Sequence, residues 1–490
     1  MLLLGVGLIT TSCEEQLAEI NRNPNAVAEL PPSYLFSLTQ LQVSGDRYEN
    51  WRANLIYSSC FIQHFSALAS YWTGDKYTYN AGYSSSLWDR NYPNALKTLE
   101  TLMANLQADP AANVNLISQL RIFRVYTYHR LTDLYGDIPY SEAIKGYSDQ
   151  IFKPKYDTQQ SIYADLLKEL EEAINAMNAS QPTFGNADFM YQGDIDQWKR
   201  WGYSQMLRIA MRMQKVDNGL ASTWAAKAIA GGVMTSNDDI AFIPHTDGPD
   251  GINMNGIGQV FLPGVEPNPR LSATLVDFLA SNNDPRLNVF GFVASGGDQK
   301  GLPNGYDQTT IQGYAGGADL ATYTQVNPLL VRTSSPMFFQ TYAEVELLWA
   351  EAILRGYVTG DAAAHYNNGV RAGMKQWELY DASLAIEDAA IDAYLAAHPF
   401  DAARGYEMIG EQYWVATFLN SYEAYANWRR LGLPALTPVN YPGNESNGQI
   451  PRRLRYPATE ISLNEANYLE ASARMTDGDA FTSRMWWDKQ

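Results

Sequence analysis

The sequence predicts a mainly α-helical chain whose helices come in tetratricopeptide-like pairs, stacked into a superhelical scaffold with a face of long loops. Three observations lead to this fold class. Apolar residues recur every three or four positions in several long segments, which is the spacing of one helix face. Gly and Pro residues end these segments and join them in pairs. Alanine-rich stripes at 225–228 and 349–352 allow close helix contacts, and an irregular all-α domain is the alternative.

The segment 116–135 shows the helical spacing most clearly. One stripe is formed by Leu116, Leu120, Phe123, Thr127, Leu131 and Leu134. Gly136 then ends the helix, and Pro139 prevents its continuation. Further helices are expected over 158–177, 198–215, 220–230 and 338–355, with others beginning near Asp361 and Gly410. In 158–177, Lys168 and Glu172 form a charge pair four residues apart on the solvent side.

The composition changes between residues 236 and 335, where Gly, Asn, Asp and Pro are frequent. Loops of this length inside a compact protein usually carry function. We therefore expect helical repeats over about 33–235 and 336–435, and a loop-rich binding section over about 236–335. Residues 65–92 are a second loop-rich section with many aromatic residues. Because no linker divides the chain, 33–490 is expected to be a single domain.

The N-terminus carries an export signature. The apolar run from Leu2 to Ile9 is too short to cross a bilayer, which takes about 20 residues, but it fits a secretory h-region. The small residues before Cys13 resemble a bacterial lipobox. This pattern predicts a signal peptide over 1–12, lipid on Cys13 and a flexible tether over 13–32. No basic residue precedes Cys13, and a disordered N-terminus with a chance cysteine is the alternative.

Charge and composition narrow the class of partner. The formal net charge is −18 and the basic residues are scattered, which argues against nucleic acid and against electrostatic docking on anionic lipid. Cys13 and Cys60 are the two cysteines, so lipid on Cys13 leaves no disulfide. Together, the 32 Tyr and 12 Trp residues outnumber the 17 Phe residues. This excess favours aromatic side chains whose polar edge contacts water. Such rings stack on the apolar faces of sugars, although most of them belong to the core or to interfaces.

Motifs of common catalytic and cofactor sites are missing. The five separated His residues and two Cys residues form no zinc pattern, and neither a P-loop nor a Gly-x-Ser-x-Gly elbow occurs. Gly256 and Gly258 begin a dinucleotide-like fingerprint, but Phe261 follows where the third glycine belongs. Glu344 and Glu351 share a helix face, where salt bridges to a neighbouring helix are favoured over a glycosidase pair.

One group of oxygen-bearing side chains is a weak candidate for structural Ca²⁺. It consists of Asp247, Asp250, Asn253 and Asn255. Their spacing does not match the EF-hand loop, and simple Asx turns are the alternative. We expect no other metal site and no cofactor.

Several segments together form a recognisable series along the chain. The helix from Arg124 runs into the turn Tyr135-Gly-Asp-Ile-Pro-Tyr140. There follow Trp198-x-x-Trp201, Met234-Thr-Ser-Asn-Asp-Asp239, Asn283-Asp-Pro-Arg286, Glu344-Val-Glu-Leu-Leu-Trp-Ala350, Trp428-Arg-Arg430 and Arg455-Tyr-Pro-Ala-Thr-Glu460. In number, order and spacing over about 120–470, these segments resemble the SusD/RagB family of outer-membrane nutrient-binding lipoproteins.

The resemblance implies a non-catalytic glycan-binding protein on the cell surface. Such a protein captures oligosaccharide and passes it to a TonB-dependent SusC-like barrel, on which it sits as a lid. Lipid on Cys13 would hold it at the outer face of the outer membrane, and Glu14 and Glu15 fit an acidic export tag. Peptide capture is the alternative within the family. A surface glycoside hydrolase and a scaffold or adhesion subunit are the alternatives outside it.

Seven aromatic residues of the two loop-rich sections are the predicted ligand contacts. They are Tyr71, Trp72, Tyr77, Trp88, Tyr306, Tyr314 and Tyr323. Their rings are expected to stack on pyranose faces while Asn, Asp and Arg side chains bond the hydroxyls. The alternative for each ring is that it packs a loop. The sequence does not identify which glycan or peptide is bound.

Overall fold

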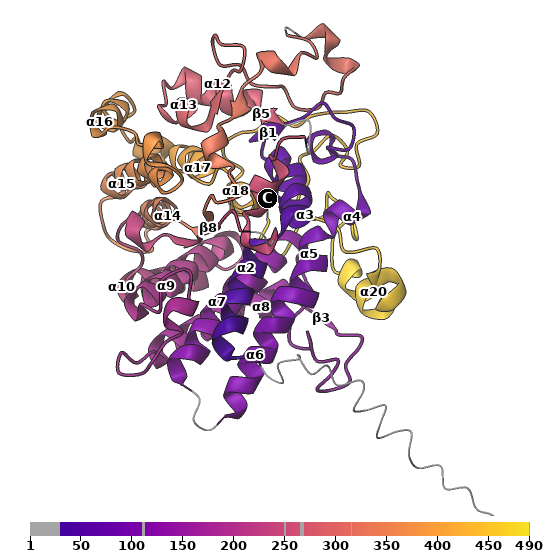
Figure 1. The fold of residues 1–490 in the computed structure, drawn as a ribbon, viewed down its shortest axis with the longest axis vertical. Coiled ribbons are helices and arrows are strands. Elements are labelled where there is room, and N and C mark those ends of the chain that lie inside the picture. The colour runs from indigo at the N-terminus through magenta and orange to yellow at the C-terminus, as the bar shows by residue number, and fades with distance from the viewer. Residues whose placement is uncertain (1–29, 110–112, 249–250, 265–268, 315, 490) are drawn as a thin grey trace, which may run out of the picture.

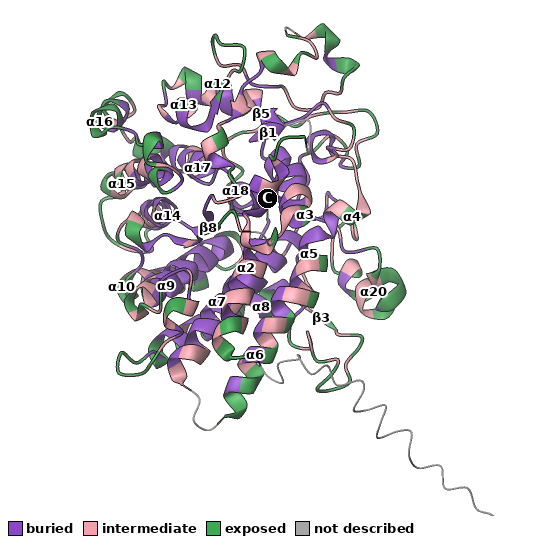
Figure 2. Ribbon diagram, in the orientation of Figure 1, coloured by how far each residue is buried: buried purple, intermediate pink, exposed green. Residues whose placement is uncertain are grey.

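The computed structural model describes residues 30–109, 113–248, 251–264, 269–314 and 316–489. Most of these residues lie in helices or loops, and the strands are short. Figure 1 shows the helices packed side by side through the lower and left parts of the molecule, with α12, α13 and neighbouring loops at the top. Figure 2 shows that the inward faces of these helices are buried and that exposed residues lie on the outer turns.

The helices in the first half of the described chain include most of the long ones and several short ones. They are α2 (Pro32–Ser44), α3 (Arg47–Glu49), the π-helix η1 (Asn50–Ser59), α4 (Ala81–Ser84), α5 (Ser86–Arg90), the π-helix η3 (Asn91–Leu96), α6 (Lys97–Ala108), α7 (Val114–Tyr135), α8 (Gln159–Ala176), α9 (Ile195–Arg212) and α10 (Asn218–Gly231).

The second half begins with short helices and returns to longer ones after residue 341. They are α11 (Gly256–Val260), α12 (Ala273–Ser281), α13 (Arg286–Phe290), α14 (Tyr342–Leu354), α15 (Ala362–Lys375), α16 (Asp388–Ala397), α17 (Gly405–Ala416), α18 (Ser421–Leu431), α19 (Glu460–Leu463) and α20 (Glu465–Ala473).

The strands form antiparallel pairs that tie distant loops together. The pairs are β1 (Phe65–Ser66) with β5 (Arg270–Leu271), β2 (Ile138–Pro139) with β3 (Tyr156–Asp157), β4 (Ala241–Ile243) with β8 (Met337–Gln340), and β6 (Gly291–Phe292) with β7 (Gln325–Val326). The β1–β5 pair joins the two sections that the sequence marks as loop-rich.

Paired helices are the organising unit of the fold, as the sequence predicts. Helix α7 packs against α8, α9 against α10, and α14 against α15. Contacts between α8 and α9 and between α14 and α17 connect one pair to the next. Helix α9 also contacts α14, so the two helical parts share one interior although the loop-rich section separates them in sequence.

Most predicted helix ends are confirmed, with two corrections. The helix expected from near Gly410 is α17, which already begins at Gly405. Helix α7 ends at Tyr135, and Gly136 follows with φ of 84°. The segment predicted as helix from 338 begins instead with strand β8, and helix α14 starts at Tyr342. All four residues of β8 are buried. A short run of buried residues shows neither the alternation of a strand nor the spacing of a helix, so the sequence pattern does not distinguish the two. Thr341 and Glu344 form a capping box that starts α14.

Gly256 and Gly258 allow neighbouring backbone segments to pack closely and do not belong to a phosphate-binding loop. A Cβ atom on Gly256 would lie 2.6 Å from the Gly45 carbonyl oxygen, and one on Gly258 would lie 2.3 Å from the Arg332 carbonyl oxygen. Both glycines lie in α11, which sits against α3 and η1. The dinucleotide-like spacing in the sequence therefore reflects tight backbone contacts.

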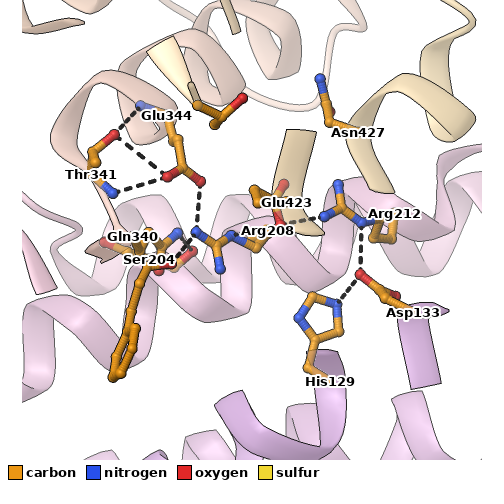
Figure 3. A network of polar contacts seen from close by, with 12 residues as sticks. His129, Asp133, Ser204, Arg208, Arg212, Gln340, Thr341, Glu344, Glu423 and Asn427 are labelled. Atoms are coloured by element: carbon orange, nitrogen blue, oxygen red, sulfur yellow. Dashed lines mark hydrogen bonds and ion pairs between the residues drawn. The ribbon is translucent and has the colours of Figure 1, made fainter. Parts of the chain in front are cut away.

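Buried ion pairs connect four helices in the interior (Figure 3). Arg212 on α9 lies 3.1 Å from Asp133 on α7 and 2.5 Å from Glu423 on α18. Arg208, one turn earlier on α9, lies 2.6 Å from Glu344 on α14. All five side chains are buried. We call these five residues the buried ion network.

The two glutamates of the buried ion network differ in their affinity for protons. Burial raises the pKa of Glu344 even though Arg208 opposes this effect. Burial acts on Glu423 as well, but Arg212 and Arg208 outweigh it and lower the pKa of Glu423 to about 2. The Tyr413 hydroxyl oxygen lies 2.6 Å from Glu423 and 3.1 Å from Glu344, so its single proton is shared between the two carboxylates. As the pH falls, Glu344 takes up a proton first.

The N-terminal predictions concern a part of the chain that the structure does not describe. The signal peptide over 1–12, Cys13, Glu14 and Glu15 all lie outside the described residues. Within the described ranges, none of the helices has both the length and the apolar character needed to span a bilayer. Cys60 is buried and unpaired, and burial raises the pKa of its thiol.

Candidate functional site

Four aromatic rings gather on one part of the surface, where α3, η1, α4 and the loop before α4 meet. The ring centre of Trp51 lies 5.5 Å from that of Tyr83 and 6.2 Å from that of Tyr71. Tyr48 lies 6.4 Å from Trp51. Tyr48 is exposed (42%) and the other three are half-buried, so each ring is partly open to solvent. We call Tyr48, Trp51, Tyr71 and Tyr83 the aromatic platform.

One arginine lies among the rings of the aromatic platform. The guanidinium carbon of Arg52 lies 5.0 Å from the ring centre of Tyr48, 5.3 Å from that of Tyr83 and 5.4 Å from that of Trp51. These distances are those of cation–π contacts. The contacts hold the planar guanidinium beside the open rings.

Two more arginines approach Tyr48 from outside. Arg47 and Arg90 each lie 5.7 Å from its ring centre. Arg90 also forms an ion pair with Asp46 at 3.1 Å, and both of these side chains are partly exposed. The platform therefore combines apolar ring faces with a local excess of positive charge.

A cavity of about 500 Å³ adjoins the platform. It is lined by Leu41, Gln42, Asp46, Arg47, Tyr48, Arg90, Asn94, Gly251, Ile252 and Gln259. This volume is in the usual range for small-ligand sites, roughly 300–1,000 Å³. The cavity and the platform share Tyr48, so a chain-like ligand that stacks on the rings can extend into the cavity.

Local backbone features hold the platform in place. The Asp46 carboxylate accepts a hydrogen bond from the Glu49 amide at 2.9 Å, and the Asn80 side chain accepts one from the Tyr83 amide at 3.1 Å. These bonds cap α3 and α4. At Gly74, a Cβ atom would lie 1.9 Å from the Ile56 carbonyl oxygen, so only glycine lets this loop lie against η1.

A larger cavity of about 700 Å³ lies between the start of α8 and the C-terminal segment. Its two arginines are paired within the protein, since Arg474 lies 2.6 Å from Asp137 and Arg484 lies 2.9 Å from Asp488. Among its lining residues, Trp486 is the one tryptophan. Because the aromatic platform offers four neighbouring rings and free guanidinium groups, we take it as the candidate site.

Four of the seven predicted ligand contacts are buried in the structure. They are Trp72, Tyr77, Trp88 and Tyr323. Trp72 has no exposed surface, and Trp88 packs edge-on against Tyr135 at 5.4 Å. Because these rings have no solvent-exposed face, we do not assign them to the candidate site. Tyr71 belongs to the aromatic platform.

Tyr306 and Tyr314 form a second, smaller ring patch. Their ring centres lie 6.1 Å apart, and both rings are half-buried. They pack around a small apolar cluster that contains Leu68 and Tyr323. Leu68 stands three residues before Tyr71, so the two predicted loop sections do meet in space. Ligand contact by any of the seven residues stays a prediction.

Tyr48, Trp51 and Arg52 were missed by the sequence reasoning. Ligand contacts were predicted in loops, whereas these residues lie on α3 and η1. The sequence does contain a signal, because Arg47-Tyr48-x-x-Trp51-Arg52 puts arginine beside aromatic residues at helical spacing. That the pattern faces solvent rather than the core is visible only in the fold.

The predicted Ca²⁺ ligands serve other contacts where the structure describes them. Asp247 accepts a hydrogen bond from the Thr333 hydroxyl, and Asn255 caps the start of α11. The carbonyl of Asn253 accepts from a nearby backbone amide at 2.9 Å. Asp250 lies outside the described residues. In the described ranges no cluster of three or more His, Cys, Asp or Glu side chains is arranged to hold a metal.

Glu344 and Glu351 form salt bridges to neighbouring helices, which confirms the favoured interpretation. Glu344 binds Arg208, and Glu351 lies 2.6 Å from Arg430 on α18 and 2.7 Å from Arg355. Both carboxylates have no exposed surface. They do not face a cleft, as a glycosidase pair must.

Comparison with known proteins agrees with the family resemblance. A family profile described as "Starch-binding associating with outer membrane" (SusD-like) matches residues 24–457. A solved structure titled chitin-binding protein is 37% identical, with a TM-score of 0.86, over 94% of this chain and 100% of the other. A Bacteroidetes SusD-like structure is 28% identical, with a TM-score of 0.83, over 94% and 100%.

A chitin-binding SusD homologue from Flavobacterium johnsoniae is 22% identical, with a TM-score of 0.79, over 94% of this chain and 98% of the other, and it supports the fold alone. No curated protein matches the chain.

Proposed function

Because the chain belongs to the SusD-like family of outer-membrane-associated glycan-binding proteins, we propose that it captures oligosaccharide without catalysing a reaction. The captured ligand passes to a TonB-dependent SusC-like barrel in the outer membrane, on which the protein sits as a lid. Lipid on Cys13 anchors it at the outer face of that membrane. The single observation that carries the binding role is the aromatic platform beside an open cavity.

The chemistry of the platform suits a sugar chain. The axial C–H faces of a pyranose ring are apolar and stack on Trp and Tyr, while hydroxyl groups bond to polar atoms at the ring edges. The ring of Trp51 neighbours the rings of both Tyr83 and Tyr71, so adjacent sugar units can stack on adjacent rings. Asn94 and Gln259 in the adjoining cavity offer amide groups for hydroxyls.

The relative at 37% identity suggests the first ligand to test. Its title describes a chitin-binding protein, and its whole length aligns with this chain. Chitin is a polymer of N-acetylglucosamine. We therefore propose an oligosaccharide containing N-acetylglucosamine as the ligand class.

The absence of catalysis is part of the proposal. Glu344 and Glu351, the carboxylates that share a helix face, are held in buried ion pairs, which supports a binding role. No turnover is expected when the protein is incubated with soluble chitin oligomers and the products are followed by chromatography.

Calorimetric titration of the purified protein with N-acetylglucosamine hexamer tests the binding role. Trp51→Ala removes the central ring of the platform and is expected to lower affinity at least tenfold, the usual loss when an interface anchor is truncated. Trp224→Ala is the control, because Trp224 is also half-buried but lies on α10 against Lys227. No binding by the parent protein to any glycan would overturn the proposal. Unchanged affinity in Trp51→Ala would remove the platform from it.

A further inference from the structure

The platform carries hydrogen-bond donors that the protein itself does not use. Within the described residues, the side chains of Arg47 and Arg52 form no ion pair and no hydrogen bond. The Nε atoms of both side chains and the indole nitrogen of Trp51 are buried without a partner. A guanidinium group has five N–H donors and no acceptor, and an indole has one donor. Unmet donors of this kind are costly unless something else satisfies them.

Among the described residues, carboxylates beside the platform do not balance its positive charge. Arg90 is paired with Asp46, which leaves the charges of Arg47 and Arg52 uncompensated. Glu49, which stands between Arg47 and Arg52 in the sequence, does not supply the missing negative charge. It is fully buried on the side of Arg130, at 3.5 Å, and burial raises its pKa to about 8. The chain as a whole has a net charge of −18, so two unpaired guanidinium groups make this part of the surface locally positive, unlike the chain as a whole.

Charged acceptors near these donors are few among the described residues, and the neutral amide oxygens of Asn94 and Gln259 lie in the adjoining cavity. The side-chain oxygen of Gln42 is buried and unpartnered. The carboxylate of Asp46 already accepts from Arg90 and from the Glu49 amide. A plain hydroxyl group donates as well as accepts and needs both kinds of partner, whereas a carbonyl or carboxylate oxygen only accepts. The site is therefore better matched to a ligand that brings acceptor oxygens.

We infer that Arg47 and Arg52 select ligands by a substituent with an acceptor oxygen, namely the acetamido carbonyl of an N-acetylated sugar or the carboxylate of an acidic one. The aromatic rings stack on the sugar, and the guanidinium groups donate hydrogen bonds to the acceptor oxygen of the substituent at the edge of the sugar. This inference rests on the proposed function and names the feature of the glycan that the site recognises. Arg47 and Arg52 are then specificity-determining residues.

The large C-terminal cavity provides an internal contrast. Its arginines, Arg474 and Arg484, are each paired with an aspartate. A ligand there would meet arginines whose charges are already paired. Selection for an acceptor substituent is therefore expected at the platform and not at this cavity.

Three hexasaccharides or comparable oligomers serve as probes in calorimetric titrations. The N-acetylglucosamine hexamer and cellohexaose share the β-1,4-linked chain and differ at C2, where one has an acetamido group and the other a hydroxyl. A uronic-acid oligomer supplies carboxylates. The parent protein is expected to bind the N-acetylated or the acidic oligomer at least tenfold tighter than cellohexaose, because sites built around hydrogen bonds reject ligands that lack the matching group.

The dependence of affinity on salt concentration distinguishes a carboxylate from an acetamido carbonyl as the acceptor. Binding of a carboxylate through exposed guanidinium groups weakens as sodium chloride is raised, whereas binding of a neutral acetamido group changes little. Arg52→Gln and Arg47→Gln are expected to reduce the preference over cellohexaose at least fivefold. Arg404→Gln, an exposed arginine on another face that pairs with Glu407, is the control and leaves the preference unchanged.

The outcomes distinguish this inference from the proposed function. If none of the oligomers binds, the proposed function itself fails. If all three bind with equal affinity, or if Arg52→Gln weakens all of them by the same factor, the protein is a glycan binder but its arginines do not select the substituent, and the inference is overturned.

Discussion

Glu423→Gln tests whether the buried ion network holds the helical parts together. Gln keeps the volume of the side chain and removes its charge. Arg212, 2.5 Å away, then keeps Asp133 as its one anionic neighbour in the network, and Arg208 keeps Glu344. Since all of these side chains are buried, removing one partner leaves a charge uncompensated in the interior. Such a loss costs about 3–5 kcal/mol of unfolding free energy.

The expected change is measurable by thermal denaturation followed by circular dichroism. With an unfolding entropy of about 2.1 cal/mol/K per residue, a chain of 490 residues loses about 1 °C of melting temperature per kcal/mol. Glu423→Gln is therefore expected to melt about 3–5 °C below the parent at pH 7. The control is Glu407→Gln, whose exposed pair with Arg404 is expected to leave the melting temperature unchanged.

The pH dependence gives the same prediction a second readout. The pKa of Glu423 is lowered from 4.5 to about 2 in the folded state, so its contribution is fully present above pH 4.5 and is lost as the pH falls towards 2. The stability difference between parent and Glu423→Gln should therefore stay constant from pH 7 to 5 and shrink below pH 4.5.

Glu344→Gln is the matched comparison. Because burial raises the pKa of Glu344 whereas the pKa of Glu423 is lowered, the folded protein stabilises the charge of Glu344 less, and the loss should be smaller than for Glu423→Gln. A Glu423→Gln protein that melts with the parent, or a difference that grows as the pH falls, would refute the reasoning.

Four further predictions follow from the placement of single residues. Trp72→Ala should lower the unfolding free energy by about 3–5 kcal/mol, because the side chain is fully buried; urea denaturation checks this, and an unchanged midpoint contradicts it. Tyr314→Ala should weaken glycan binding if the second ring patch touches the ligand, and an unchanged calorimetric affinity removes that patch from the site. Mass spectrometry of the native protein should show acyl chains on Cys13, and an unmodified cysteine would undo the anchor. If Asp247 helps to hold Ca²⁺, chelation with EDTA should lower the melting temperature of the parent but not of Asp247→Ala; an equal or absent effect argues for an Asx turn.

Local spacing was enough to predict the paired helices. The stripe that includes Leu120 and Leu131 repeats at the helical period, and Gly136 ends it in the sequence and in the structure. The strand β8 was missed because four consecutive buried residues have no period. The role of Glu344 was predicted correctly, since a carboxylate on an apolar helix face needs a cation from a neighbouring helix.

The candidate site was predicted only in part, because exposure is not a local property. Trp72 is fully buried while Tyr71, its neighbour, stays partly open. Successive side chains in a loop point in different directions, and the packing of the loop on η1 decides which of them meets solvent. Trp51 and Arg52 become part of a site only because α4 brings Tyr83 beside them.

By itself, the sequence determined the mainly helical fold class, the pairing of helices, the family, and the absence of the common catalytic motifs. These follow from spacing along the chain, which reports on neighbours three or four residues away. The tertiary structure alone decided which rings are exposed, that Arg47 and Arg52 beside them have no carboxylate partner among the described residues, and which buried charges compensate one another. Those properties depend on contacts between residues far apart in sequence, such as Arg212 and Glu423, and no local pattern contains them.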